Sequence, residues 1–254
     1  KHHLGLFNEI QIPKADDYQK FGSEEHRVAA YNAASESITL LKNEKNILPL
    51  STNNSILLIG PTANSLNCLN GAWTHTWQGL DETYNNKFPT IKDVIEDRFS
   101  RVNYFEGSKM IMKDGDETDI PSLDLKQAVK AAKSSDVAII CLGELPSTER
   151  PGDIYTLDLP KEQQLIVKEL SKTGIPIVIV LVEGRPKIVR EIEPLSDAII
   201  QAYLPGDQGA SAIVDVLCGN INPSGKLPYT YPRYNGVIMH YDYKQSELLN
   251  ANTW

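Results

Sequence analysis

Cysteine is scarce in this chain and is not arranged for crosslinking or for binding a metal. The 254 residues include three cysteines, Cys68, Cys141 and Cys218, which lie far apart and form no CxxC pair. This pattern excludes a disulfide framework and a cysteine-based metal centre. Cys141 lies within an apolar run, so we expect it in the core. His2 and His3 are adjacent but have no third ligand nearby, so we expect no metal and no cofactor.

The chain also lacks a long apolar run and an excess of basic residues. No stretch of about 18 apolar residues occurs, so we expect no transmembrane helix. The net charge is −8 and the pI is about 5.2. No basic face is visible, which argues against nucleic acid or a membrane surface as a partner. The composition, 41% hydrophobic and 23% charged, is ordinary for a soluble globular protein.

Apolar segments alternate with amphipathic ones along the chain. A helix is predicted over 23–43, with Ser23 as its N-cap and small and apolar residues along one face. Predicted strands follow at 55–60, 102–107, 136–143, 176–184 and 197–203. Predicted helices lie at 90–99, 123–134, 160–172 and 208–219. This alternation is typical of an α/β fold with a mostly parallel sheet and helices on both faces.

Three loops leave the carboxyl ends of the predicted strands, where such sheets bind ligands: 61–79, 143–159 and 204–207. The first has no GxGxxG or GxxxxGK[ST] pattern, so nucleotide binding by a flavodoxin-like domain has little support. It carries Trp73 and Trp77, which could be a helical aromatic pair in the core. The surrounding Gly, Asn, Thr and His are poor helix formers, which favours a loop that displays indole rings. Flat apolar rings beside polar groups suit the faces of sugars.

The second loop places several charged residues directly after the most apolar strand. The stretch LGELPSTERPGD carries Glu144, Glu149, Arg150 and Asp153. A loop carboxyl can act as a general acid when burial or a second carboxylate raises its pKa. The same residues could instead form a surface ion-pair cluster, and the residues alone favour that interpretation.

Several motifs occur in the same order as in the family 3 glycoside hydrolases, which are β-glucosidase and exo-β-glucanase-like enzymes. The resemblance extends from residue 4 to about residue 233, and its motifs are AASESITLLKNEKNILPL, GAWTHTWQG, LGELPSTERPGD, EGRP, YLPGDQGASAIVDVLCG and NPSGKLPYTYP. The family pairs an N-terminal TIM-like barrel with a six-stranded α/β sandwich, and this chain resembles the sandwich. The resemblance implies residues 1–21 as the end of the barrel domain and a linker, 22–233 as the sandwich, and 234–254 as the start of an extension or linker.

The resemblance also implies roles for individual residues. Glu149 corresponds to the general acid/base of a retaining mechanism, and Trp77, supported by Trp73, corresponds to the aromatic residue of the aglycone subsite. Glu144 and Arg150 are given supporting roles. The tyrosine that is common before the family's threonine is replaced here by Ser147.

The nucleophile of such a mechanism is an aspartate of the barrel, and no matching stretch is present. Ser135-Asp136 and Ser196-Asp197 each precede a predicted strand, which is the wrong end for a catalytic residue in a parallel sheet. We therefore expect the chain to be part of a longer protein, to require the barrel domain as its partner and to be inactive alone.

The expected function is hydrolysis of terminal β-D-glycosyl residues from oligosaccharides or polysaccharides, in an exported, periplasmic or extracellular, full-length protein. The alternative is a non-catalytic carbohydrate-binding or structural domain.

Overall fold

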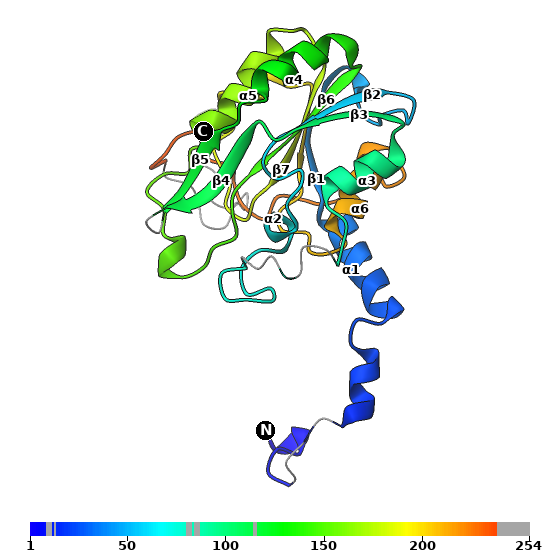
Figure 1. The fold of residues 1–254 in the computed structure, drawn as a ribbon. Helices are drawn as coiled ribbons and strands as arrows, with labels where there is room; N and C mark the ends of the chain where they lie inside the picture. Colours follow the sequence, from blue (N-terminus) through cyan, green and yellow to red (C-terminus); the bar gives the residue numbers. More distant parts are fainter. Residues whose placement is uncertain (9–11, 13, 80–82, 84–86, 114–115, 238–254) are drawn as a thin grey trace, which may run out of the picture.

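The fold is built around one six-stranded sheet (Figure 1). The computed structural model describes residues 1–8, 12, 14–79, 83, 87–113 and 116–237. The strand order is β1-β8-β7-β6-β2-β3. These strands are β1 Thr39–Asn43, β2 Ser55–Ile59, β3 Arg101–Phe105, β6 Val137–Gly143, β7 Ile177–Val182 and β8 Ala198–Gln201. All neighbouring pairs are parallel except β1 with β8, so the predicted mostly parallel α/β sheet is confirmed.

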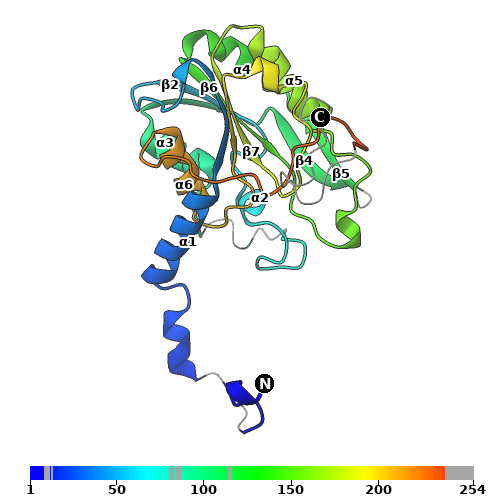
Figure 2. The same cartoon turned by 180° about the vertical axis from the view of Figure 1, so that it is seen from behind.

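Helices cover both faces of the sheet, so its central strands are buried on both sides. Every residue of β2, β6 and β7 is buried, and alternate side chains of each strand enter opposite apolar clusters. One cluster is covered by α1, α3 and α6 and the other by α4 and α5 (Figures 1 and 2). These helices are α1 Glu24–Ser37, α3 Ile91–Arg98, α4 Leu125–Ala131, α5 Lys161–Ser171 and α6 Gly209–Leu217.

The predicted helix over 23–43 is wrong in its last six residues, 38–43. Ser23 caps α1 as predicted, accepting from the backbone N–H of His26, but the helix ends at Ser37 and residues 39–43 form β1. This strand pairs antiparallel with β8 at the edge of the sheet. Leu40 packs against one apolar cluster and Leu41 against the other, which a strand permits through its alternation. Tertiary pairing therefore overrides the local helical pattern.

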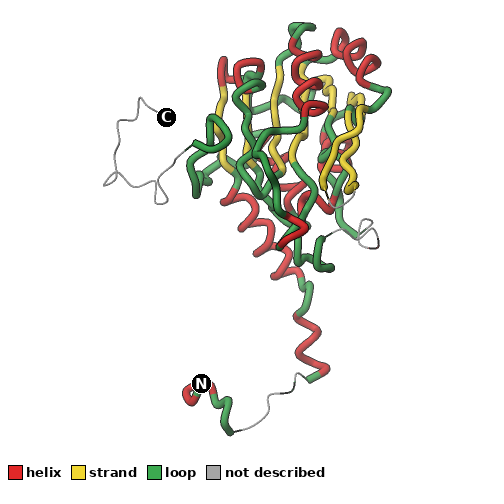
Figure 3. The backbone as a smooth tube through the Cα atoms, turned by 90° about the vertical axis from the view of Figure 1, so that its left-hand side faces the viewer, coloured by secondary structure: helices red, strands yellow, loops and turns green. Residues whose placement is uncertain are grey.

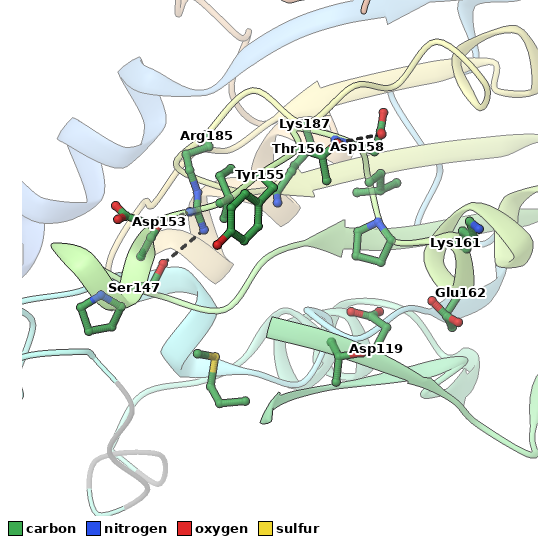
Figure 4. Close-up of a pocket in the computed structure, with 17 residues that line it drawn as sticks. Asp119, Ser147, Asp153, Tyr155, Thr156, Asp158, Lys161, Glu162, Arg185 and Lys187 are labelled. Atoms are coloured by element: carbon green, nitrogen blue, oxygen red, sulfur yellow. Dashed lines mark hydrogen bonds between the residues drawn. The ribbon is translucent and has the colours of Figure 1, made fainter. Parts of the chain in front are cut away.

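A second pair of strands was not predicted. β4 Ser108–Lys113 pairs antiparallel with β5 Asp116–Pro121, outside the main sheet. The sequence Asp114-Gly115 between them is a common hairpin turn signal, and these two residues lie outside the described ranges. The pair lies beside α5, close to the loop that follows β6 (Figure 4).

The loops of the parallel strands gather at one edge of the sheet, and two glycines let them pack closely. A Cβ at Gly60 would lie 2.1 Å from the carbonyl oxygen of Cys141, and one at Gly143 would lie 1.9 Å from that of Val182. The backbone of Gly143 also exchanges two hydrogen bonds, both 2.9 Å, with the buried Gln163 side chain. The start of the loop after β6 is therefore held on the strand and on α5.

The N-terminal residues lie away from the sheet. The short helical turns His2–Leu4 and Ala15–Lys20 lie beyond the start of α1 (Figure 3). This arm exposes several large apolar side chains, which are Leu4, Leu6, Phe7, Ile12, Tyr18 and Phe21. Within the described ranges, no helix combines the length and apolar character needed to cross a bilayer.

A buried carboxyl stands at the end of β7. Glu183 is fully buried, accepts from the Tyr231 hydroxyl at 2.5 Å and from the backbone N–H of Lys187 at 3.1 Å, and its Oε2 has no partner among the described residues. Burial raises the pKa of Glu183 to about 8, and the neighbouring Glu144 carboxylate adds to that increase.

The packing at Gly143 yields a stability test. Gly143→Ala should lower the free energy of unfolding by at least about 3 kcal/mol, because the new methyl overlaps the Val182 carbonyl. Gly174→Ala is the matched control, since Gly174 also has positive φ but has nothing within 4 Å of its Cβ position. It should lose roughly 1–2 kcal/mol. Equal losses in urea unfolding of the two variants would contradict the close approach at Gly143.

The buried Glu183 yields a pH test. Between about pH 5 and pH 8 the folded carboxyl keeps a proton that the unfolded one has lost, so the free energy of unfolding falls as pH rises. Glu183→Gln cannot ionise, so its stability relative to the unmodified chain should increase by about 2–4 kcal/mol across this window. The exposed Glu191→Gln is the control and should show no such trend. A pH-independent difference for Glu183→Gln would mean that Glu183 is ionised in the fold.

Candidate active site

The tryptophan loop follows β2 and displays its two indole rings. It begins with a short helix, α2 Leu66–Asn70, and then turns at Gly71. Trp73 is 67% exposed and Trp77 is 48% exposed, and the backbone N–H of Trp73 donates to the carbonyl of Trp77 at 3.0 Å. The backbone of Trp73 and His75 has positive φ. These residues therefore form a tight loop, and the interpretation as a helical pair in the core is wrong.

The loop that follows β6 carries Glu149 in an exposed position. Glu149 and Arg150 are exposed and lie at the start of a short turn, Arg150–Gly152. The backbone of Glu149 has φ 55° and ψ −153°, a combination that is costly for a residue with a side chain. Strain of this kind persists only where the surrounding structure fixes the backbone.

The two loops are joined through a pair of hydrogen bonds. The Gln78 side-chain amide donates to the carbonyl of Thr148 at 3.3 Å and accepts from its backbone N–H at 3.1 Å. Trp77 and Glu149 each neighbour one of these joined residues in the chain. An exposed carboxyl and an exposed indole are therefore placed on adjacent, connected loops.

Glu144 has a different environment from Glu149. Its side chain is 5% exposed. Oε1 accepts from the backbone N–H groups of Gly184 at 3.0 Å and Arg185 at 2.9 Å. Oε2 accepts from the Arg185 guanidinium at 2.7 and 2.8 Å and lies 3.4 Å from the Lys187 ammonium. These side-chain contacts of Glu144 join the loop after β6 to the segment after β7.

Arg185 was not singled out as a site residue from the sequence. Its guanidinium donates to the Gly152 carbonyl at 2.6 Å and to the Ser147 hydroxyl at 3.1 Å, in addition to Glu144. The guanidinium that contacts both sides of this loop is therefore that of Arg185. Arg150, which was given a supporting role, is exposed. The EGRP motif was the only available signal, because nothing in the local pattern shows which loop Arg185 reaches.

Two cavities flank the loop after β6. One of about 280 Å³ lies among Ala72, Glu149, Gly184 and Leu204, and so adjoins both the tryptophan loop and Glu149. The other, of about 440 Å³, lies between the far side of the loop and the β4–β5 pair (Figure 4).

The larger cavity has a mixed polar lining. Lys187 and the exposed Tyr155 lie on one side and Asp119 on the other (Figure 4). Burial raises the pKa of Asp119, which accepts from Ser108 at 3.0 Å.

Other aspartates of the sheet serve its backbone. Asp136 accepts from the backbone N–H of Ser55 at 2.7 Å, and Asp197 accepts from that of Ile177 at 2.9 Å. Both carboxylates lie where strands begin, at the edge opposite the two loops. Among the described residues, no group of three or more His, Cys, Asp or Glu side chains is placed to hold a metal ion.

Comparison with known proteins gives matches over most of the chain. Residues 38–253 match the Glycosyl hydrolase family 3 C-terminal domain. The chain is 41% identical to the "Lysosomal beta glucosidase" of Dictyostelium discoideum, across 97% of this chain and 31% of that protein. It is 32% identical to the "Periplasmic beta-glucosidase" of Salmonella typhimurium, across 95% of this chain and 34% of that protein.

A solved structure supports the same relationship. The crystal structure of the β-glucosidase of Listeria innocua superimposes with a TM-score of 0.77 at 29% identity, covering 92% of this chain and 31% of the other. The chain therefore spans about a third of the length of the relatives that it matches. On the family match, the shared α/β sheet and the identity to these relatives, the chain belongs to glycosyl hydrolase family 3, as a C-terminal domain.

Proposed function

We propose that this chain is the second domain of a retaining, exo-acting β-glycosidase of β-glucosidase type, and that Glu149 is its general acid/base. The observation that carries the proposal is the placement of Glu149. It is exposed on a loop that Gln78 joins to the tryptophan loop, and it adjoins a cavity. Glu144, the other glutamate of the stretch, is buried and fully engaged by Arg185 and backbone N–H groups.

The proposed mechanism divides two carboxyl groups between two domains. A retaining glycosidase needs a nucleophile and an acid/base about 5–5.5 Å apart. In this proposal the nucleophile is an aspartate of a barrel domain outside residues 1–254, as the family resemblance implies. Asp136 and Asp197 accept hydrogen bonds from strand starts at the opposite edge. Glu149 first protonates the leaving oxygen and then removes a proton from the water that attacks the glycosyl-enzyme.

The tryptophans supply the aglycone site in this proposal. Both indoles are exposed, and an indole face offers a flat apolar surface to the C–H face of a sugar ring. Trp77 contacts the sugar beyond the cleaved bond, and Trp73 supports it through the backbone hydrogen bond between them. The substrate is a β-linked oligosaccharide with a terminal glucosyl residue, in keeping with the names of the relatives.

The N-terminal arm supports a barrel partner. Phe7 and Phe21 are 72% and 87% exposed, and such apolar side chains gain free energy when another domain covers them. The names of relatives as periplasmic and lysosomal favour an exported or compartment-enclosed enzyme.

Replacement of Glu149 tests the proposal in the full-length protein. Glu149→Ala should reduce disaccharide hydrolysis by about 100- to 10,000-fold, the usual contribution of general acid–base catalysis. Glycosylation by a dinitrophenyl glycoside should fall far less, because that leaving group needs no proton. The covalent intermediate should accumulate, and azide should restore turnover and yield the β-glycosyl azide.

Two further variants complete this test. Asp153→Asn alters an exposed carboxylate of the same loop and should show neither leaving-group dependence nor azide rescue. Azide rescue of a Glu144→Ala variant and not of Glu149→Ala would reverse the assignment. Unchanged hydrolysis by Glu149→Ala would favour the non-catalytic carbohydrate-binding domain.

Replacement of Trp77 tests the aglycone site. Trp77→Ala should weaken binding of substrates that extend past the cleaved bond by on the order of 1 kcal/mol, the value of one stacking contact. Steady-state kinetics with an oligosaccharide and an aryl glucoside should show the larger loss for the oligosaccharide. Equal losses for both substrates would make Trp77 a packing residue.

A further inference from the structure

We propose that Arg185 is a positioning residue for proton transfer, because it holds both sides of the turn that carries Glu149. The inference rests on the proposed role of Glu149. It adds a residue from a different strand end, which contacts the loop on both sides of that carboxyl.

Arg185 contacts residues on both sides of Glu149 in the sequence. Nη2 donates to the Ser147 hydroxyl at 3.1 Å, two residues before Glu149, and Nη1 donates to the Gly152 carbonyl at 2.6 Å, three residues after it. A guanidinium is a rigid plane with donors in fixed directions. One side chain therefore sets the separation between the two sides of the turn.

Arg185 is itself fixed to the sheet. Its Nε and Nη2 contact Oε2 of Glu144 at 2.8 and 2.7 Å, and its backbone N–H donates to Oε1 of the same carboxylate at 2.9 Å. Glu144 follows the last residue of β6, and Arg185 follows β7 by three residues. The position of the turn is thus fixed relative to β6 and β7, two paired strands of the core.

The backbone of Glu149 needs such support. Its φ of 55° and ψ of −153° cost on the order of 1–3 kcal/mol for a residue with a side chain. The side chain is exposed, so its direction depends on the backbone more than on packing. Without the contacts of Arg185 with Ser147 and Gly152, the turn can relax and move the carboxyl away from the leaving oxygen. A displacement of about 1 Å can cost about 100-fold in rate.

Arg185→Lys separates this role from electrostatics. A lysine keeps the positive charge beside Glu144, where Lys187 already lies 3.4 Å from Oε2, but it lacks the planar fork. In the full-length protein, this variant should lose about 10- to 100-fold in kcat/KM for a disaccharide. It should lose less than about threefold in kcat/KM for a dinitrophenyl glycoside, because that ratio reports the glycosylation step, which needs no proton for this leaving group. The kcat and KM for that substrate should fall together, because deglycosylation still needs Glu149 as base.

A double variant tests whether Arg185 acts through Glu149. Once Glu149 is alanine, loss of its positioning should have no further effect, so Glu149→Ala/Arg185→Lys should lie within about twofold of Glu149→Ala on the disaccharide. Arg190→Lys is the control, since Arg190 is an exposed arginine of the same post-β7 segment that pairs with Glu191. It should retain the activity of the unmodified protein.

Hydrogen exchange gives a structural test that does not depend on any substrate. Amide hydrogen exchange in residues 147–153 of Arg185→Lys should accelerate by at least about tenfold, whereas exchange in β6 and β7 stays unchanged. Should Arg185→Lys fail to fold, Ser147→Ala is the substitute. It removes one contact of Arg185 with the loop and leaves the ion pair between Arg185 and Glu144 intact. It should show the same leaving-group pattern with a loss of about two- to fivefold.

The outcomes separate this inference from the proposed function. If Glu149→Ala shows no leaving-group dependence and no azide rescue, the proposed function fails and this inference fails with it. Suppose that Glu149→Ala behaves as expected. Only the inference is wrong if Arg185→Lys then lowers activity equally on both substrates or on neither, or if the double variant is clearly less active than Glu149→Ala alone. A selective loss on the disaccharide with a non-additive double variant supports it.

Discussion

The structure at this edge of the sheet depends on the burial of one carboxylate, that of Glu144. A charged group at this depth is strongly unfavourable unless it is paired and hydrogen-bonded. Two backbone N–H groups and the guanidinium of Arg185 meet that requirement. They come from the segment after the neighbouring strand, so satisfying Glu144 forces the ends of β6 and β7 into one arrangement. The Arg185 side chain is then directed at the turn that carries Glu149.

The carboxyl groups of the described sheet fall into two classes. Glu144, Asp136 and Asp197 accept hydrogen bonds from the backbone and maintain the fold, and Glu183 is buried against Tyr231. Glu149 instead faces solvent on a loop that Gln78 fixes beside an exposed indole. This division suits a domain that contributes one catalytic carboxyl to a site completed by another domain.

Sequence reasoning reached the parts of the structure that depend on local patterns. Periodicity predicts the strands β2, β6 and β7 and the loops beyond them, because the apolar residues of each segment indicate that the segment is buried. β1 was missed because its residues continue a helical pattern, and only pairing with β8 makes them a strand. The β4–β5 pair was missed although an Asp-Gly signal lies between its strands.

The candidate site shows the same limit. The exposed tryptophan loop and the position of Glu149 after β6 were accessible from motifs and strand order. The contacts of Gln78 with Thr148 and of Arg185 with Ser147 join residues 70 and 38 positions apart, and such separations leave no periodic signature. The identity of Arg185 as the residue that holds the loop therefore required the three-dimensional arrangement.

Identification of the nucleophile tests the central claim, that these 254 residues supply one carboxyl of a retaining pair and another domain supplies the other. A 2-deoxy-2-fluoroglucoside with an activated leaving group should trap the glycosyl-enzyme of the full-length protein, because retention proceeds through that covalent species. Peptide mapping by mass spectrometry should place the label on a carboxylate outside residues 1–254. A label on any carboxylate within residues 1–254 would contradict the account.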